Sequence, residues 1–290
     1  MPVKVASICM SNEKAWVGEK LTYFYSQPGM SEQEVLAVAD FYIDLSVKLI
    51  EKAASNGAKM ACLPEVTIEI GKWLRSVERV QRMDMARRCW DRTMAAWSRV
   101  TAQCDIVLVG GIIEPDGDQL YNSAPVIDER GNLLGCYRKV QLAATENHLV
   151  SYGDSFPVFQ TTHGRVGALI CWDIMFPEAA MSLAYNGAQI IFQPTYGHSG
   201  WAADVMAQTR AMDTCCPFVI AMWDGAGAII DRDGKILARA QRTRDWRDLI
   251  PDQIIYAEVD PCAPRKFIGY NDYGEAMLHQ RRWSAYAPRR

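Results

Sequence analysis

The sequence has no long apolar run and carries little net charge. None of its 290 residues falls in a stretch that approaches the roughly 20 apolar residues needed for a membrane span. The N-terminus, MPVKVASICMSNEKAW, has no apolar segment behind a basic start. The formal net charge is −3 with both signs interspersed, so no global field is available to hold a polyanion. We therefore expect a cytoplasmic protein that binds neither membranes nor nucleic acid.

Histidine is scarce, and paired metal-ligand motifs are missing. The chain has four histidines and nine cysteines, but no C-x-x-C motif and no His/Cys ligand pair. The odd number of cysteines fits reduced thiols better than disulfides or a structural zinc site. No histidine stands in a setting like that of papain-like or caspase-like proteases. If a cysteine is catalytic here, its base must be another type of residue.

The chain also lacks a Ser/Gly-rich linker and an evident repeat. Turn signals recur evenly until about Pro261, which predicts a single domain over residues 1–262. Residues 263–290 carry six Lys or Arg against two acidic residues, with several aromatic residues between them. A solvated basic tail is one interpretation. Because aromatic side chains favour burial, we prefer a tail that packs on the domain or on a partner subunit.

What the sequence does have is a large apolar fraction, 49%, arranged in short runs. These runs predict strands over residues 3–9, 59–63, 105–113, 120–127, 133–140, 156–161, 165–171, 189–193, 217–223, 227–231, 236–240 and 253–259. Helices are predicted over 31–57, which begins with a capping box at Ser31 and Glu34, and over 84–103, 177–186 and 201–215. The turns EPDGDQ, DERGN, THGR and DRDGK predict hairpins, so the sheets should be mixed, with helices on one face.

Three of these apolar runs end on residues that can do chemistry. Cys171 lies in RVGALICWDIMFPE, between the end of a strand and the start of a helix, a geometry that suits a nucleophile. Glu65 ends KMACLPE, and Lys139 ends LLGCYRK. Taken singly, each has an ordinary interpretation, as a buried thiol, a helix cap and a solvated strand end. Together they would place an acid-base pair around a thiol.

In these motifs the sequence resembles the carbon-nitrogen hydrolase, or nitrilase, superfamily. The resemblance extends from VKVASICM through CLPE, VGGIIE, YNSAPVIDERGNLLGCYRKVQL and GDSFPVF to RVGALICWDIMFPEAA and the last strands. It is weakest over residues 72–100 and after 261. Three separated motifs in the family's order form a specific signal. The resemblance implies an α/β fold, a four-layer α-β-β-α sandwich of two mixed sheets.

The resemblance also assigns catalytic roles. It implies Glu65 as the base, Lys139 as the family's lysine, Cys171 as the nucleophile, and Glu146 as a second glutamate that supports lysine and water. The backbone N–H of Trp172 is the expected second oxyanion donor. No metal and no organic cofactor is required, because lysine and backbone donors supply the electrophilic assistance.

The residues around Cys171 bear on the substrate. Nitrilases of the family typically follow the cysteine with Trp-Glu, whereas CWD followed by FPE resembles the amidase and carbamoylase branches. Carbamoylases that accept amino-acid derivatives often place an arginine shortly after the cysteine, where this chain has Ile174 and Met175. We therefore predict hydrolysis of a small amide or N-carbamoyl compound. A nitrilase is the alternative, and a catalytically silent binding protein on the same scaffold is a third possibility.

By position, Tyr196, His198 and Trp201 are candidate pocket residues, and Met175 and Trp172 suggest an apolar wall beside the nucleophile. Ordinary loop packing is an equally good interpretation of the first three. Relatives commonly pair through helices, so the resemblance implies a homodimer or a higher homo-oligomer. The helix after Pro177 and the basic tail are the candidate contacts.

Overall fold

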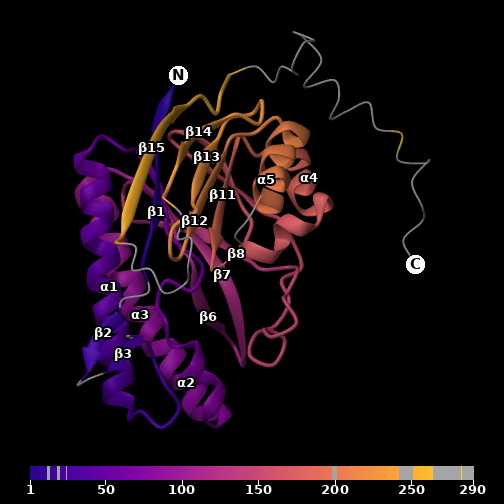
Figure 1. The fold of residues 1–290 in the computed structure, drawn as a ribbon. Coiled ribbons are helices and arrows are strands. Elements are labelled where there is room, and N and C mark those ends of the chain that lie inside the picture. Colours follow the sequence, from indigo (N-terminus) through magenta and orange to yellow (C-terminus); the bar gives the residue numbers. More distant parts are fainter. Residues whose placement is uncertain are drawn as a thin grey trace.

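Two β-sheets lie face to face in the middle of the protein, and helices cover the outer face of each (Figure 1). In this computed structural model the described residues are 1–11, 14–17, 20–23, 25–197, 201–241, 251–263 and 282. The arrangement confirms the predicted α/β fold with four layers in the order α-β-β-α.

The first sheet is mixed, with the order β15-β1-β4-β5-β7-β6, and β8 also pairs with β7. Strands β1, β4 and β5 run parallel, whereas β15, β6, β7 and β8 join it through antiparallel pairs. The bounds are β1 (Val3–Cys9), β4 (Met60–Cys62), β5 (Val107–Val109), β6 (Ile112–Asp116), β7 (Gln119–Ile127), β8 (Leu133–Arg138) and β15 (Gln253–Val259).

The second sheet is also mixed, with the order β14-β13-β12-β11-β10-β9. Its three central strands β10, β11 and β12 are parallel, and the outer strands add antiparallel pairs. The bounds are β9 (Val158–Thr161), β10 (Gly164–Ala168), β11 (Ile190–Thr195), β12 (Phe218–Met222), β13 (Ala228–Ile230) and β14 (Ile236–Arg239). A separate hairpin joins β2 (Lys14–Val17) to β3 (Lys20–Tyr23).

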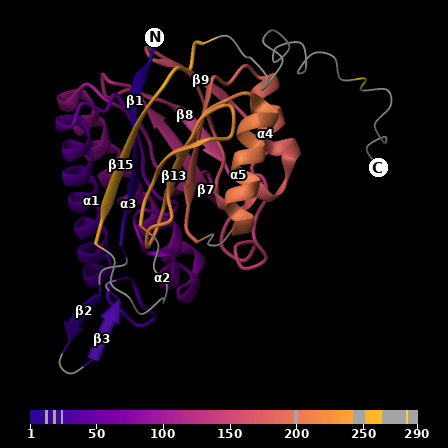
Figure 2. The same cartoon turned by 45° about the horizontal axis from the view of Figure 1, so that its top comes forward.

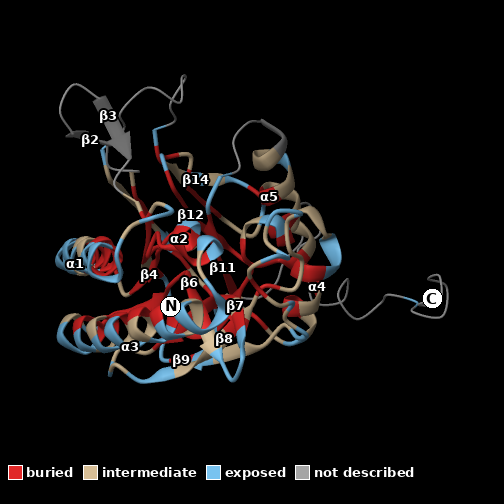
Figure 3. Cartoon of the chain, turned by 90° about the horizontal axis from the view of Figure 1, so that it is seen from below, coloured by how far each residue is buried: buried red, intermediate tan, exposed pale blue. Residues whose placement is uncertain are grey.

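Helices α1 (Glu32–Ser55) and α3 (Arg79–Cys104) cover the first sheet, and α4 (Pro177–Tyr185) and α5 (Trp201–Thr214) cover the second (Figure 2). The short α2 (Gly71–Ser76) lies at one end of the first sheet. Seen from below, buried residues fill the centre and exposed residues mark the outer sides of α1 and α3 (Figure 3). The helices thus turn one apolar face inward and one polar face to solvent.

Strand β1 shows why the central strands have nearly continuous apolar sequences. Val3 and Val5 belong to the core between the two sheets, while Ala6 and Ile8 belong to the core between the first sheet and its helices. Alternate residues of a strand point to opposite faces, so a strand covered on both sides needs apolar residues throughout. A third core lies between the second sheet and α4 and α5.

Several local predictions are confirmed. The capping box opens α1, with the Ser31 backbone N–H donating to Glu34 Oε2 at 2.7 Å and the Glu34 N–H donating to Ser31 Oγ at 3.3 Å. All four predicted turns join antiparallel neighbours, in the pairs β6–β7, β7–β8, β9–β10 and β13–β14.

The predicted strand over 105–113 is wrong, because the chain forms two strands there, β5 and β6, separated by Gly110 and Gly111. A Cβ on Gly111 would lie 2.3 Å from the Pro64 carbonyl oxygen, and one on Gly110 would lie 2.2 Å from the Trp97 ring. Because glycine has no Cβ, the backbone at these two positions can pass close to these groups. The chain stops pairing with β4 at this point and continues to pair with β7.

Elements that the sequence pattern did not predict are α2 and the β2–β3 hairpin, and α3 begins at Arg79 rather than at residue 84. Helix α2 has only six residues and no side-chain cap, so periodicity cannot identify it. Tertiary packing holds it: Trp73 and Leu74 are buried, and Trp73 Nε1 donates to the Met30 carbonyl at 2.8 Å.

The predicted tail over 263–290 lies outside the described residues, apart from residues 263 and 282. In the part of the chain that the structure describes, no helix combines the length and apolarity of a membrane span.

Candidate active site

Glu65 follows β4, and its backbone is fixed on both sides. Trp223 Nε1 donates to the Glu65 carbonyl at 2.7 Å, and the Thr67 N–H donates to the Gly111 carbonyl at 2.7 Å. Thr67 Oγ1 also donates to the Pro64 carbonyl at 2.7 Å. The Glu65 side chain is 4% exposed, so the strand end delivers a buried carboxylate to the site.

Lys139 follows β8 and lies between two carboxylates. Its Nζ donates to Glu65 Oε1 and to Glu146 Oε2, each at 2.7 Å, and its side chain is 1% exposed. Burial lowers the pKa of Lys139, but the negative charges of Glu65 and Glu146 oppose this effect, and the net shift is upward. Lys139 is therefore an ammonium ion at neutral pH.

Asn122 on β7 joins the two carboxylates from another side, and sequence reasoning missed it. Its Nδ2 donates to Glu65 Oε1 and to Glu146 Oε1, both at 2.7 Å, and its carbonyl accepts from the Lys139 N–H at 2.8 Å. The register of β7 against β8 brings Asn122 next to Lys139, and nothing within the motif YNSAP indicates this contact. Glu146 is held further by the Ala143 N–H, which donates to Oε2 at 2.7 Å.

Cys171 begins a 3₁₀ turn, Cys171–Met175, three residues after β10 ends at Ala168. Its φ is +44°, in the left-handed region that residues other than glycine rarely adopt. Asp173 holds this turn: its carboxylate accepts from the Tyr137 hydroxyl at 2.7 Å and from the N–H groups of Ile170 and Gln141 at 2.9 Å. The strained turn is thus fixed by neighbours in the chain and by strand β8.

Burial controls the ionisation of the thiol. It raises the pKa of Cys171 to about 12, with a further upward contribution from Glu65, while Lys139 and the N–H groups of Tyr196 and Gly197 lower it. Without a ligand, Cys171 is a thiol at neutral pH. Burial likewise raises the pKa of Asp173 to about 6, although the hydrogen bonds that it accepts oppose the shift.

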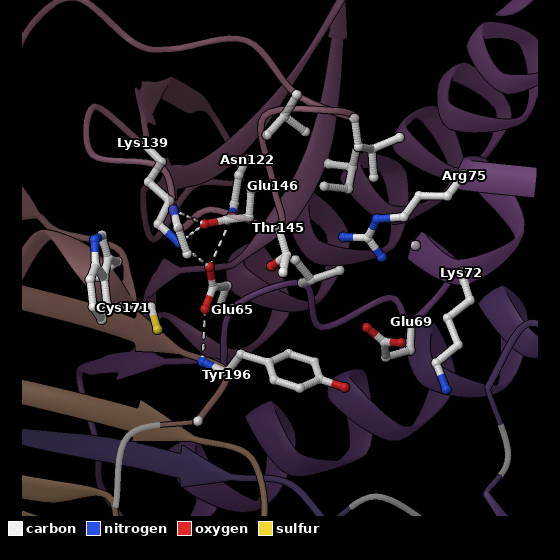
Figure 4. A pocket seen from close by; sticks show the side chains of 18 residues that line it. Glu65, Glu69, Lys72, Arg75, Asn122, Lys139, Thr145, Glu146, Cys171 and Tyr196 are labelled. Atoms are coloured by element: carbon white, nitrogen blue, oxygen red, sulfur yellow. Dashed lines mark hydrogen bonds and ion pairs between the residues drawn. The ribbon is translucent and has the colours of Figure 1, made fainter.

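A cavity of about 420 Å³ brings these groups together (Figure 4). The four residues predicted as catalytic, Glu65, Lys139, Glu146 and Cys171, all line it, and so does Trp172. Three of them come from the first sheet and its loops, and Cys171 comes from the second. The three separated motifs therefore meet at one site across the two sheets.

The predicted substrate-binding residues have different outcomes. Tyr196 lines the cavity, and its N–H donates to Glu65 Oε2 at 2.8 Å. Met175 does not line it, because the 3₁₀ turn directs Met175 to the core under α4 and α5; its predicted place in the pocket wall is wrong. His198 and the Trp201 side chain lie outside the described residues.

The end of the cavity away from Cys171 is lined by Glu69, Lys72 and Arg75, which sequence reasoning also missed (Figure 4). Two of these residues belong to α2, the helix too short to be predicted. Across the described ranges, no group of three or more His, Cys, Asp and Glu residues could hold a metal ion.

The family assignment follows from comparison with known proteins. Residues 37–263 match the family model described as carbon-nitrogen hydrolase. Because the match spans most of the chain, the chain belongs to the carbon-nitrogen hydrolase family, and the resemblance stated from the motifs is confirmed.

Individual relatives agree with this assignment. A citrullinase of Francisella tularensis is 30% identical over 74% of this chain and 82% of its own length. A probable nitrilase of Schizosaccharomyces pombe is 37% identical over 43% of this chain. The match spans about half, 47%, of that protein. The solved structure of a mutant amidase of Nesterenkonia AN1, from the nitrilase superfamily, shares the fold, with a TM-score of 0.71, 17% identity and coverage of 97% of this chain and 95% of that chain.

Proposed function

We propose that the protein hydrolyses a small amide or N-carbamoyl compound through a thioester on Cys171. One observation carries the proposal: a buried ammonium, Lys139, lies 2.7 Å from each of two carboxylates at the wall of a cavity that also contains a thiol. A base, an electrophilic group and a nucleophile at one cavity are what acyl transfer requires.

The first half of the reaction forms the thioester. Glu65 accepts the Sγ proton while sulfur bonds to the carbonyl carbon and the carbonyl π electrons move to oxygen. Burial raises the pKa of the resting thiol to about 12, so we propose that proton removal accompanies attack. Lys139 and the Trp172 N–H stabilise the oxyanion, and each such donor is worth about 10²–10³ in rate. On collapse the C–N bond breaks, and Glu65 returns the proton to the leaving ammonia or amine.

The second half releases the acid. Water attacks the thioester carbon while Glu65 accepts one of its protons. The C–S bond then breaks, and the thiolate takes the proton back from Glu65. Glu146 has an indirect role: its contacts with Lys139 and Asn122, at 2.7 Å each, hold both partners of Glu65 in place. We therefore assign Glu146 as a positioning residue.

The choice between amide and nitrile rests on two observations. The citrullinase acts, by its name, on a compound with a carbamoyl group, and this chain covers 82% of it, against 47% of the probable nitrilase. The second observation concerns the residue two positions after Cys171. Nitrilases of the family typically have Glu at this position, whereas this chain has Asp173, which accepts three hydrogen bonds that hold the turn. Nitrile hydrolysis is the second candidate, favoured by the 37% identity to the probable nitrilase.

Ammonia release from panels of amides, ureido compounds and nitriles tests the proposal. We expect turnover of amides or ureido compounds, and its loss in Cys171→Ala with an unchanged circular dichroism spectrum. Added hydroxylamine should yield a hydroxamate from the thioester. Turnover that survives Cys171→Ala, or that is confined to nitriles, would contradict the proposal.

We also propose a cytoplasmic homodimer with one catalytic domain over residues 1–262. The nine cysteines are free thiols, which supports a reducing compartment. A contact through α4 follows the expectation from the family resemblance. Light scattering of the full chain tests the dimer, and a monomer at micromolar concentration would contradict it.

A further inference from the structure

The end of the cavity farthest from Cys171 carries charged groups that no proposed step of the reaction uses. Glu69 lies on the segment between β4 and α2, and Lys72 and Arg75 lie on α2 (Figure 4). A hydrolase that worked on the smallest uncharged amides would need none of them.

The Glu69 carboxylate is buried, and among the described residues it makes no direct contact with a donor or a cation. The residue is 6% exposed, and the carboxylate has no hydrogen bond or direct ion pair within the described part of the chain. The segment itself is fixed, because the Ser26 N–H donates to the Glu69 carbonyl at 3.1 Å. A carboxylate that is buried and unpaired is costly, so this position favours a cationic ligand. Burial raises the pKa of Glu69 to about 7, against the opposing charges of Lys72 and Arg75.

Arg75 is exposed, and its guanidinium also has no hydrogen bond or direct ion pair among the residues that the structure describes. Its side chain extends toward the cavity (Figure 4). Lys72 differs, because its Nζ lies 3.9 Å from the centroid of the Tyr25 ring. A guanidinium presents two parallel N–H donors that match a carboxylate, so Arg75 is the better anion site of the two.

We propose that Glu69 and Arg75 bind the ammonium and the carboxylate of an α-amino acid whose side chain ends in the amide or ureido group cleaved at Cys171. This inference rests on the proposed function and names its substrate class. A single anion would meet the repulsion of Glu69, and a single cation that of Arg75 and Lys72. A zwitterion satisfies both signs at once.

Apolar lining residues fit the rest of such a substrate. Val66, Ile113, Leu149 and Val150 also line the cavity, and they suit methylene groups. The cavity thus offers charged groups at one end, the thiol at the other, and apolar lining residues for a chain of methylene groups. The anion site lies on α2, which explains why the positions after Cys171, Ile174 and Met175, need no arginine.

Four amides of equal chain length test the two charges separately. Glutamine has both charges, glutaramate lacks the ammonium, 4-aminobutanamide lacks the carboxylate, and butanamide lacks both. A ureido set of greater length is citrulline, 5-ureidopentanoate, N-carbamoylputrescine and butylurea. In at least one set, we expect kcat/KM of the zwitterion to exceed that of each singly charged compound by about 10- to 100-fold.

Variants connect each preference to its residue. In Glu69→Gln, kcat/KM of the zwitterion should lie within about threefold of kcat/KM of the compound without ammonium. In Arg75→Gln, kcat/KM of the zwitterion should lie within about threefold of kcat/KM of the compound without carboxylate. Arg79→Gln is the matched control, because Arg79 pairs with Asp118 outside the cavity and its loss should leave every ratio unchanged.

The outcomes separate this inference from the proposed function. The inference is wrong if neither zwitterion is preferred, if only one of the two ratios responds to its variant, or if both variants change all four compounds equally. Hydrolysis of butanamide or butylurea that depends on Cys171 would then still support the proposed function. No Cys171-dependent hydrolysis in either set would overturn the inference, and the wider panels of amides, ureido compounds and nitriles would then decide the proposed function.

Discussion

Lys139 is the residue on which the charge balance of the site depends. Its ammonium separates the buried carboxylate of Glu65 from the partly buried carboxylate of Glu146, which would otherwise face each other through Asn122 alone. Breaking a buried ion pair from one side leaves an uncompensated charge, which costs about 3–5 kcal/mol. The same ammonium is the proposed oxyanion donor, so its removal should affect stability and rate together.

We expect Lys139→Met to lower the free energy of unfolding by about 3–5 kcal/mol and kcat/KM by at least about 10³. Urea denaturation and ammonia release measure the two effects. Lys59→Met is the control, because Lys59 forms an exposed ion pair with Asp105 and should cost at most about 1 kcal/mol. Equal stability of the two variants would contradict this account of the site.

The raised pKa of Cys171 gives a pH prediction. A thiol reacts as the thiolate, and a pKa of about 12 means that the thiolate fraction grows about tenfold per pH unit across the whole neutral range. The alkylation rate of Cys171 by iodoacetamide in the ligand-free protein should therefore keep rising from pH 7 to 10. Mass spectrometry follows the reaction, with Cys171→Ala as the blank. A plateau near pH 8.5, as for a free cysteine, would show that burial does not control the thiol.

Among the elements, the break between β5 and β6 matters most for the site. The sequence predicted a single strand over 105–113, because DIVLVGGII is almost entirely apolar. Hydrophobic periodicity does not reveal where a strand changes the neighbouring strand with which it pairs. The close approach of Gly111 to Pro64, which ends the strand, is a contact across 47 residues of chain and leaves no local signal. By contrast, the four hairpins were predictable, because their turn residues act locally.

Gly111→Ala should disturb Glu65, since the new Cβ would lie 2.3 Å from the Pro64 oxygen and 2.7 Å from the Glu65 Cα. We expect a loss of kcat of at least about tenfold, since a shift of about 1 Å at a reacting group costs up to 10². Gly117→Ala is the control: its φ of +57° predicts some loss of stability, but no contact lies within 4 Å, so kcat should be unchanged. An active Gly111→Ala protein would mean that β4 and β6 can move apart without moving Glu65.

At the scale of the whole molecule, the family resemblance implied the four layers, and the sequence motifs identified three of the segments that meet in the cavity. Sequence reasoning missed Asn122, Glu69, Lys72 and Arg75, which reach the site through strand register and through a helix of six residues. It also placed Met175 in the pocket wall, because spacing along the chain does not reveal which side of a 3₁₀ turn faces the core. The charged groups at strand ends were predictable, whereas groups brought in by tertiary packing were not.

The distribution of thiols predicts a labelling pattern. Five cysteines are buried, three are partly buried and Cys262 is exposed. A mild thiol reagent should label Cys262 first, and the buried Cys9, Cys62, Cys89, Cys215 and Cys216 should react only after unfolding in urea. Mass spectrometry of native and unfolded samples gives the count. Native labelling of Cys62, which lies between the two sheets, would be incompatible with the packed core.

Because Cys171 belongs to one sheet and its partners Glu65 and Lys139 to the other, the reacting atoms span the seam between two independently hydrogen-bonded layers. Hydrogen bonds within each sheet keep the strands in register, whereas the apolar contacts of the central core and a few hydrogen bonds between the sheets, such as Ser7 Oγ to the Ile220 carbonyl, fix how one sheet lies over the other. The rate of turnover therefore reports how well the two sheets are aligned. With increasing urea concentration, turnover should decline while circular dichroism still reports intact strands and helices.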